Sequence, residues 1–294
     1  MVDIQSSWNE LQKITIGMFA LCMVLMLVQI LVAVIRWKIV LDALGECLHF
    51  WHLCNIMYMS LFFTLVTPGT AGGDAVRVWK INKKGSHISK AMNSVLIERI
   101  ATLFGLILLV VITQPFLINR IGHVPGEWVF PSLMIIGSLS IGALLFLDKV
   151  PMGKYKNLKI VRGLHALASD ARMIFLNFRY NFSLLFVALF GQIIFSLIVY
   201  VLAVSLNVNI TILDCMVLVP PALLVMALPV SIAGWGAREF VMVTTFGYIS
   251  IPSEQSLALS ILFGLVILCS ILPAGLLWLL RLFHQSVKKD GISD

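Results

Sequence analysis

Two stretches of the chain combine residue types that bind phosphate with residues that interrupt helices. The first runs from Pro68 to Arg77 and the second from Pro229 to Arg238. Counted from each proline, both have a hydroxyl residue at position two, a glycine at position five and an arginine at position nine. Arginine offers paired N–H donors that match phosphate, and glycine lets the backbone approach a ligand closely. Each stretch is therefore predicted to form half of a binding site for an anionic group.

The candidate binding residues lie in these two stretches and at the start of one apolar run. Glu98 and Arg99 point about 100° apart on a helix, so each needs a partner elsewhere, and Asp74 or Arg77 could serve Glu98. Asp74 and Glu239 could orient the arginines, or bind a proton or a cation. In the alternative interpretation, Arg77 and Arg238 are interfacial anchors whose charged heads reach water. The full candidate set is Gly69, Thr70, Gly72, Gly73, Asp74, Arg77, Glu98, Arg99, Ser231, Gly234, Trp235, Gly236, Arg238 and Glu239.

No residue pattern indicates a catalytic centre or a cofactor. The chain contains no phosphate-binding P-loop, no HExxH and no GxSxG. His49 and His52 would share a helix face between Cys47 and Cys54, but this spacing differs from that of zinc sites, so interfacial histidines are the preferred interpretation. The five cysteines form no CxxC pair and are expected to be buried thiols. We expect no catalytic residue, no metal and no cofactor.

Composition indicates an integral membrane protein. Of the 294 residues 60% are hydrophobic and 12% are charged, whereas soluble domains are about 45–50% apolar and about 25% charged. The net charge of +7 is expected to reflect topology and contact with anionic lipids, not binding to nucleic acid. Residues 1–294 are predicted to form a single membrane domain. Five apolar runs are long enough to span a bilayer, at about 14–35, 95–118, 128–147, 182–205 and 256–280.

Lysine and arginine placement predicts the topology. Two shorter apolar stretches, 50–67 and 212–233, end in the paired motifs. If both are re-entrant, most of the 21 Lys and Arg residues fall on one side, and only Lys13, Arg120 and Arg238 fall on the other. This asymmetry is typical of the cytoplasmic side, so the N-terminus is predicted to lie outside the cell membrane and the C-terminus in the cytoplasm.

The same topology predicts an inverted repeat. The fold class is thus an all-α polytopic membrane protein with about five full spans plus two oppositely oriented re-entrant broken-helix hairpins. Repeat 1 covers about 36–118 with its re-entrant motif at 50–90, and repeat 2 covers about 182–280 with its motif at 212–248. Residues 148–180 form a cytoplasmic amphipathic segment between them. Trp8, Trp37, Trp51 and Trp128 are assigned to the membrane interfaces. Ser138 and Gly142 could pack helices, either within one chain or in a homo-oligomer.

The motifs resemble those of a known family. The runs from Thr67 to Arg77, Ser94 to Arg99 and Leu228 to Glu239 are similar, in order and spacing, to the lysylphosphatidylglycerol synthase transmembrane-region family. The resemblance implies a flippase-like protein that moves a phosphate-headgroup lipid, such as an aminoacyl-phospholipid or a polyprenyl-phosphate-linked sugar, across the membrane. The 294 residues hold no soluble aminoacyl-transferase domain, so we expect no lipid synthesis by this chain.

Two other functions remain open at this point. The chain could be a membrane-embedded glycosyl or lipid-modifying transferase that uses a polyprenyl-phosphate donor, with Asp74, Glu98 or Glu239 as the base. It could also be a non-catalytic subunit of an envelope-assembly complex. The expected partners are an anionic phospholipid or a polyprenyl-phosphate lipid, together with the membrane itself. Activity in detergent, where no leaflets exist, would distinguish a transferase from a flippase.

Overall fold

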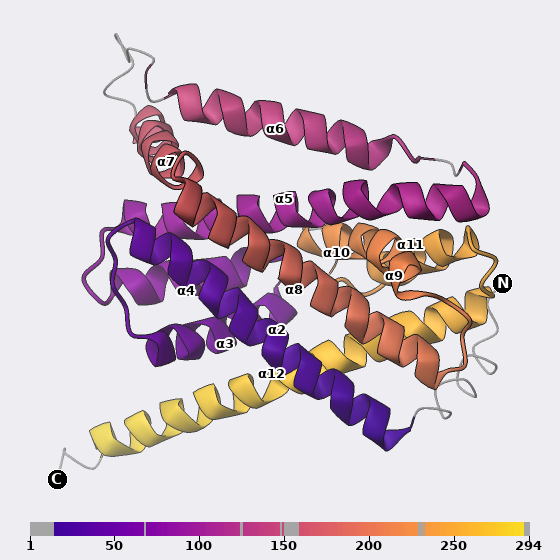
Figure 1. Ribbon diagram of the computed structural model, residues 1–294. Helices are drawn as coiled ribbons and strands as arrows, with labels where there is room; N and C mark the ends of the chain where they lie inside the picture. The colour runs from indigo at the N-terminus through magenta and orange to yellow at the C-terminus, as the bar shows by residue number, and fades with distance from the viewer. Residues whose placement is uncertain are drawn as a thin grey trace.

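The described part of the chain is helical. The computed structural model describes residues 15–67, 69–123, 126–147, 149, 159–228, 231 and 233–290, and only the backbone of residues 159, 160 and 276–290. Within these ranges there is no strand, and five helices are long and apolar enough to cross a membrane. The prediction of an all-α protein with five long apolar helices is confirmed. They are α2 (Ile16–Ala43), α5 (Ile88–Ile121), α6 (Val129–Leu147), α8 (Phe178–Ser205) and α12 (Ser253–Asp290) (Figure 1).

Helix α2 continues well past the predicted end of its apolar run. It includes Arg36 and Trp37, which are only 6% and 0% exposed, because both pack inside the helix bundle. The assignment of Trp37 to a membrane interface is therefore wrong. Trp51 and Trp128 are mostly exposed, as interfacial residues would be, and Trp8 lies outside the described residues.

Both paired motifs interrupt helices. Helix α3 (Phe50–Val66) stops before the first motif and α4 (Ala71–Asn82) follows it, and the two helices pack against each other. In the second half, α9 (Ile212–Leu218) and α10 (Pro220–Ala227) precede the motif and α11 (Ala237–Gly247) follows, packed on α10. Pro68 and Pro229 themselves lie outside the described residues.

One glycine in each motif is required by the local geometry. A Cβ at Gly73 would collide with the Thr64 hydroxyl and lie 2.6 Å from the Ser60 carbonyl oxygen, so α4 can lie against α3 only because this side chain is absent. Gly234 has φ +79°, a left-handed conformation that glycine adopts without strain. It helps to reverse the chain before α11.

The helices recur in the same order of lengths in the two halves. Helices α2, α3, α4 and α5 have 28, 17, 12 and 34 residues, while α8, α11 and α12 have 28, 11 and 38, with α9 and α10 in the place of α3. In Figure 1, α3 and α4 lie toward the left end of the long helices and α9 to α11 toward the right end. Two inverted repeats would give this arrangement. Re-entrance from opposite sides of a membrane stays a prediction.

Basic residues of the helix ends gather at the α3–α4 end of the bundle. The end of α4, the start of α5, the end of α6 and the start of α8 all lie there in Figure 1. These ends carry Lys83, Lys84, Lys90, Lys149 and Arg179. Arg120 lies at the other end of α5. This distribution is typical of a cytoplasmic face, although which side of the membrane that end faces stays a prediction.

The predicted amphipathic segment contains a helix, α7 (Lys159–Phe175). Its residues Ala168, Ala171 and Ile174 are fully buried, and the last two pack with Leu184 of α8 and Ile97 of α5. The apolar face of α7 thus contacts the protein. Residues 150–158 of this segment lie outside the described ranges. Helix α6 packs on α5 and α7 and has no buried residue, so much of its apolar surface is left for lipid.

Candidate functional site

The two helix breaks meet in the structure. The Gly69 N–H group donates a hydrogen bond to the Ser231 carbonyl oxygen at 3.4 Å, which joins the first motif to the second. Beside this contact is a cavity of about 360 Å³ whose walls come from both halves, including Gly69 and Ala233. Most of its lining is apolar. The polar residues that line it are Thr64, Thr70, Asp74, Arg99, Thr102 and Gln192.

Asp74 and Arg99 form the charged part of the cavity wall. The Arg99 guanidinium donates to Asp74 through both Nε and Nη2, with a shortest distance of 2.8 Å. Their side chains keep 32% and 24% of their accessible surface, for Arg99 and Asp74 respectively. The Thr70 hydroxyl lies 3.4 Å from the Asp74 carboxylate. An ion pair with this exposure can still exchange its partner for a ligand.

Behind this wall lies a second carboxylate that is completely enclosed. Glu98 is 1% exposed and accepts from Arg36 Nε at 2.7 Å and from Arg77 Nη1 at 3.0 Å. Arg77 also binds Asp74 at 2.5 Å, and the three arginines and two carboxylates therefore form one chain of ion pairs. A buried charge is tolerated only when it is paired and hydrogen-bonded, as these are. The network carries a formal charge of +1.

Packing holds the inner arginines in place. The Arg77 guanidinium carbon lies 5.2 Å from the centroid of the Trp37 ring, and the indole N–H group of Trp37 donates to the Ser94 hydroxyl at 3.3 Å. Arg77 is 3% exposed. Its guanidinium is fixed by two carboxylates and an aromatic face, which leaves little freedom to contact a ligand. The interpretation of Arg77 as an anchor that reaches water is therefore wrong.

The second motif has a different environment. Arg238 is 1% exposed and pairs with Glu239 at 2.5 Å, while its Nε donates to the Ser260 hydroxyl of α12 at 3.2 Å. Its guanidinium carbon lies 4.8 Å and 5.9 Å from the ring centroids of Trp235 and Phe263. Glu239 also accepts from the Gly236 N–H group at the start of α11. This motif is neutral, and Arg238 likewise does not act as an anchor that reaches water.

The candidate residues thus fall into four groups. Gly69, Thr70, Asp74 and Arg99 line the cavity. Arg77 and Glu98 support it from behind. The remaining candidates either shape the helix breaks, as Gly72, Gly73, Ser231 and Gly234 do, or lie at the start of α11, as Trp235, Gly236, Arg238 and Glu239 do. Whether any of them binds a ligand stays a prediction.

Three further residues belong to the site although the sequence did not single them out for it. Arg36 binds Glu98, Thr102 lines the cavity, and Gln192 lines it and donates weakly to the Thr102 carbonyl oxygen at 3.5 Å. Through this bond Gln192 also links α8 to α5. Gln29 and Arg36 stand seven residues apart on one face of an apolar helix. That spacing was the available signal that α2 has a polar inner side.

The described residues show no arrangement for a metal ion. No group of three or more His, Cys, Asp or Glu side chains within these ranges is placed to hold one. His52 lies on α3 and His49 is the N-cap residue of that helix, with ring centroids 6.2 Å apart and the rings edge to face. Of the neighbouring cysteines, Cys47 is exposed and Cys54 is half-buried.

Two comparisons with known proteins bear on the site. The model of the family described as lysylphosphatidylglycerol synthase TM region matches residues 1–275. A UPF0104 membrane protein of Archaeoglobus fulgidus is 35% identical over 66 residues, which are 22% of this chain and 20% of that protein. The family match covers every residue that lines the cavity. The second match spans about a fifth of the relative's length.

Proposed function

The chain belongs to the lysylphosphatidylglycerol synthase transmembrane-region family, and from that premise we propose that it moves a lipid with a phosphate headgroup between the leaflets of a membrane. The headgroup would bind in the cavity between the two helix breaks. The observation that carries this proposal is the half-exposed Arg99 at the end of an ion-pair network with one more arginine than carboxylate.

An anion can enter this network without breaking its buried part. Arg99 is bound to Asp74 alone among the charged groups of the network, whereas Asp74 is also held by Arg77. A phosphate that takes the place of Asp74 beside Arg99 leaves the Asp74–Arg77 and Glu98 pairs intact. Because the three remaining pairs (Asp74–Arg77, Glu98–Arg77 and Glu98–Arg36) stay formed, the excess positive charge is available to the ligand at Arg99.

Backbone and side-chain donors surround the same point. Helix α4 begins at the cavity, and its N-cap residue Thr70 makes no capping bond from its side chain. The first N–H groups of a helix and its dipole favour an anion. Thr70, Thr102 and Gln192 add hydroxyl and amide groups around Arg99. A phosphate has several oxygens to satisfy, and this set offers donors from three helices.

Alternating exposure of the cavity would follow from its position between the two halves. Between the described residues of the two breaks, the backbone contact is one long hydrogen bond, from the Gly69 N–H group to the Ser231 carbonyl oxygen. Rocking of one half against the other would break it at small cost, since a typical net hydrogen bond contributes only about 0.5–1.5 kcal/mol. Rigid-body motion of repeats around a central site is the general mode of such transporters.

The test is lipid movement in vesicles. Purified protein is reconstituted into phosphatidylcholine vesicles with a trace of tail-labelled phosphatidylglycerol, and a membrane-impermeant quencher reports the rate at which the label changes leaflet. We expect wild-type protein to accelerate this movement and Arg99→Ala to slow it about 10–100-fold, the loss expected when one or two hydrogen bonds to a charged group are removed. Arg99→Lys, which keeps the charge but not the paired donors, should fall between them.

A matched control uses another basic residue. Lys38 is about equally exposed and pairs with Asp42 on the surface of α2, away from the cavity lining, so Lys38→Ala should move lipid like wild type. Equal rates for Arg99→Ala and wild type would refute the assignment of Arg99. Wild-type vesicles no faster than empty ones, with phosphatidylglycerol and with a polyprenyl phosphate, would refute the flippase proposal and favour the transferase or the subunit.

A further inference from the structure

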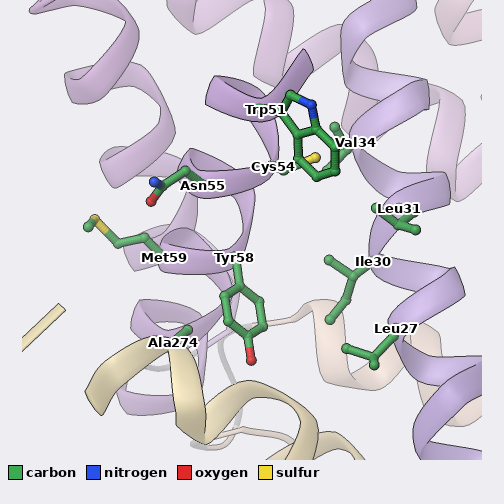
Figure 2. A pocket seen from close by; sticks show the side chains of 10 residues that line it. All are labelled: Leu27, Ile30, Leu31, Val34, Trp51, Cys54, Asn55, Tyr58, Met59 and Ala274. Atoms are coloured by element: carbon green, nitrogen blue, oxygen red, sulfur yellow. The ribbon is translucent and has the colours of Figure 1, made fainter. Parts of the chain in front are cut away.

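A second cavity, of about 460 Å³, is lined by residues of α2, α3 and α12, three helices that also line the cavity with Arg99. Figure 2 shows four aliphatic residues of α2, from Leu27 to Val34, opposite the α3 residues from Trp51 to Met59, with Ala274 of α12 at one end. Leu27, Leu31 and Trp51 are 48%, 43% and 71% exposed. The cavity is therefore an apolar groove that opens on the surface of the bundle, within the length of a predicted span.

The groove and the cavity with Arg99 share a wall formed by the same three helices. Each of these helices lines both spaces with residues no more than one turn apart. The groove is lined by Leu27 of α2, Tyr58 of α3 and Ala274 of α12. The cavity is lined by their neighbours Met26, Leu61 and Ile271. The contact between α3 and α12 is part of this wall. The two spaces are thus neighbours, one with charged and polar groups and the other almost entirely hydrocarbon.

The α3–α12 contact is built from parts that can separate. The Tyr58 hydroxyl donates to the Ser270 carbonyl oxygen at 2.8 Å, and the Phe62 ring fills the space that a side chain at position 275 would occupy. Pro273 lies inside α12 at this level and cannot donate the backbone hydrogen bond of a regular helix, so the helix can bend there. Among the described residues, this hydrogen bond and this aromatic contact form part of the packing between α3 and α12.

From this arrangement we infer that the groove between α2 and α3 binds a hydrocarbon chain of the lipid whose phosphate lies at Arg99. The Tyr58–Ser270 contact closes the passage between this groove and the cavity with Arg99. This inference rests on the proposed function. A lipid with its headgroup inside the bundle still has chains to bury in an apolar surface, and the groove supplies that surface next to the headgroup cavity. Its volume lies within the range of ordinary ligand sites.

The experiment uses a photoreactive lipid in nanodiscs. Phosphatidylglycerol with a diazirine on its acyl chain is crosslinked to the protein, and the labelled peptides are identified by mass spectrometry. We expect residues 27–34 and 51–59 to be labelled several-fold more than the exposed apolar face of α6 around Leu139, and Leu31→Trp, which fills the groove, to remove that excess. Leu139→Trp is the matched control, since it adds the same side chain on an exposed face.

Two further experiments test whether the hydrocarbon chain in the groove belongs to a lipid with a phosphate headgroup. A diazirine diacylglycerol without phosphate should label the groove no more than it labels α6, and Arg99→Ala should lower the groove labelling by phosphatidylglycerol to that level. In Tyr58→Phe the lipid should label the groove faster than in wild-type protein, because the contact that closes the passage has lost its hydrogen bond. Equal groove labelling with and without phosphate would make the groove an ordinary lipid contact and overturn the inference.

The failure of this inference can be told from the failure of the proposed function. If vesicles show Arg99-dependent lipid movement but Leu31→Trp changes neither labelling nor rate, the groove assignment is wrong and the flippase proposal stands. If wild-type protein moves no lipid and the labelling of the groove does not depend on Arg99, both are wrong. Short-chain dihexanoyl phosphatidylglycerol gives a second check, since its binding should depend on Arg99 and not on Leu31.

Discussion

The break between α3 and α4 and the break between α10 and α11 differ in charge and in access to the cavity. Arg77 and Arg238 occupy the same position in the repeated motif, and each is buried, paired with a carboxylate and placed on an aromatic face. The first break adds Arg36 and Arg99 to its network, whereas in the described part of the chain the polar partners of Arg238 are Glu239 and the Ser260 hydroxyl. The repeated arginine therefore supports both breaks, and the arginine that lines the cavity is Arg99, which lies outside the motif.

This difference indicates how two repeated hairpins come to differ in charge. An internal repeat supplies two hairpins of similar shape, and a shared position within it is expected to have the same structural task in both. Binding requires an asymmetry, because a lipid headgroup has one charged end. Here the asymmetry comes from α2 and α5, which add two arginines and one glutamate around the first hairpin.

The largest effect is expected from Glu98→Gln, which would break the first network at its centre. Arg36 and Arg77 would both lose their common carboxylate inside the bundle, and an unpaired buried charge costs about 3–5 kcal/mol. The free energy of unfolding in detergent should fall by that amount in a denaturant titration. Glu46→Gln is the control: it loosens a peripheral pair with the half-exposed Lys90, for which less than about 1 kcal/mol is expected. If the free energy of unfolding fell equally in the two variants, the buried ion-pair network would not be what stabilises the first half of the protein.

A smaller loss is expected from Arg238→Met in the second half. Methionine keeps much of the apolar contact with Trp235 and Phe263 but removes the charge. Glu239 is partly exposed and keeps the Gly236 N–H group, so the loss should be about 1–3 kcal/mol, the cost of an incompletely satisfied polar group. The rate of lipid movement per folded molecule should stay near wild type. A loss of transport as large as that of Arg99→Ala, with the fold intact, would show that the two breaks share the binding task.

The fold and part of the site could be predicted from local features of the sequence. Apolar run length gave the five long helices, and the 100° turn between Glu98 and Arg99 required different partners, which proved to be Arg77 with Arg36 for one and Asp74 for the other. Arg36 was missed because a charged residue at the edge of an apolar run is ordinarily interfacial. Only the packing of α2 against α5 and α8 shows that it faces inward.

The unlike surroundings of Arg77 and Arg238 could not be predicted. They depend on Ser260 and Phe263 of α12 in one case and on Arg36 and Trp37 of α2 in the other. These contacts join residues far apart in the sequence, and no spacing argument within one motif identifies them. The repeated pattern therefore predicted two equivalent half-sites, whereas tertiary packing gives one half a net charge and a position on the cavity wall.

The two glycines at the fifth motif position give the finest comparison. In Gly73→Ala the new methyl group meets the Thr64 hydroxyl and the Ser60 carbonyl oxygen, and backbone cannot move aside, so α4 must separate from α3. Overpacking of this kind costs about 1–3 kcal/mol. In Gly234→Ala the methyl group lies 2.5 Å from Met226 Cγ, a flexible side chain, and the left-handed φ adds about 1 kcal/mol.

The unfolding free energies of these two variants should therefore differ, with Gly73→Ala the less stable. Transport sharpens the test, because Gly73 precedes Asp74 and its displacement moves one member of the charged wall, whereas Gly234 lies in the neutral break. Gly73→Ala should slow lipid movement more than its stability loss accounts for, and Gly234→Ala should not. If the two variants lose stability and transport equally, the breaks are equivalent after all, and the asymmetry assigned to Arg99 and Arg36 has no bearing on function.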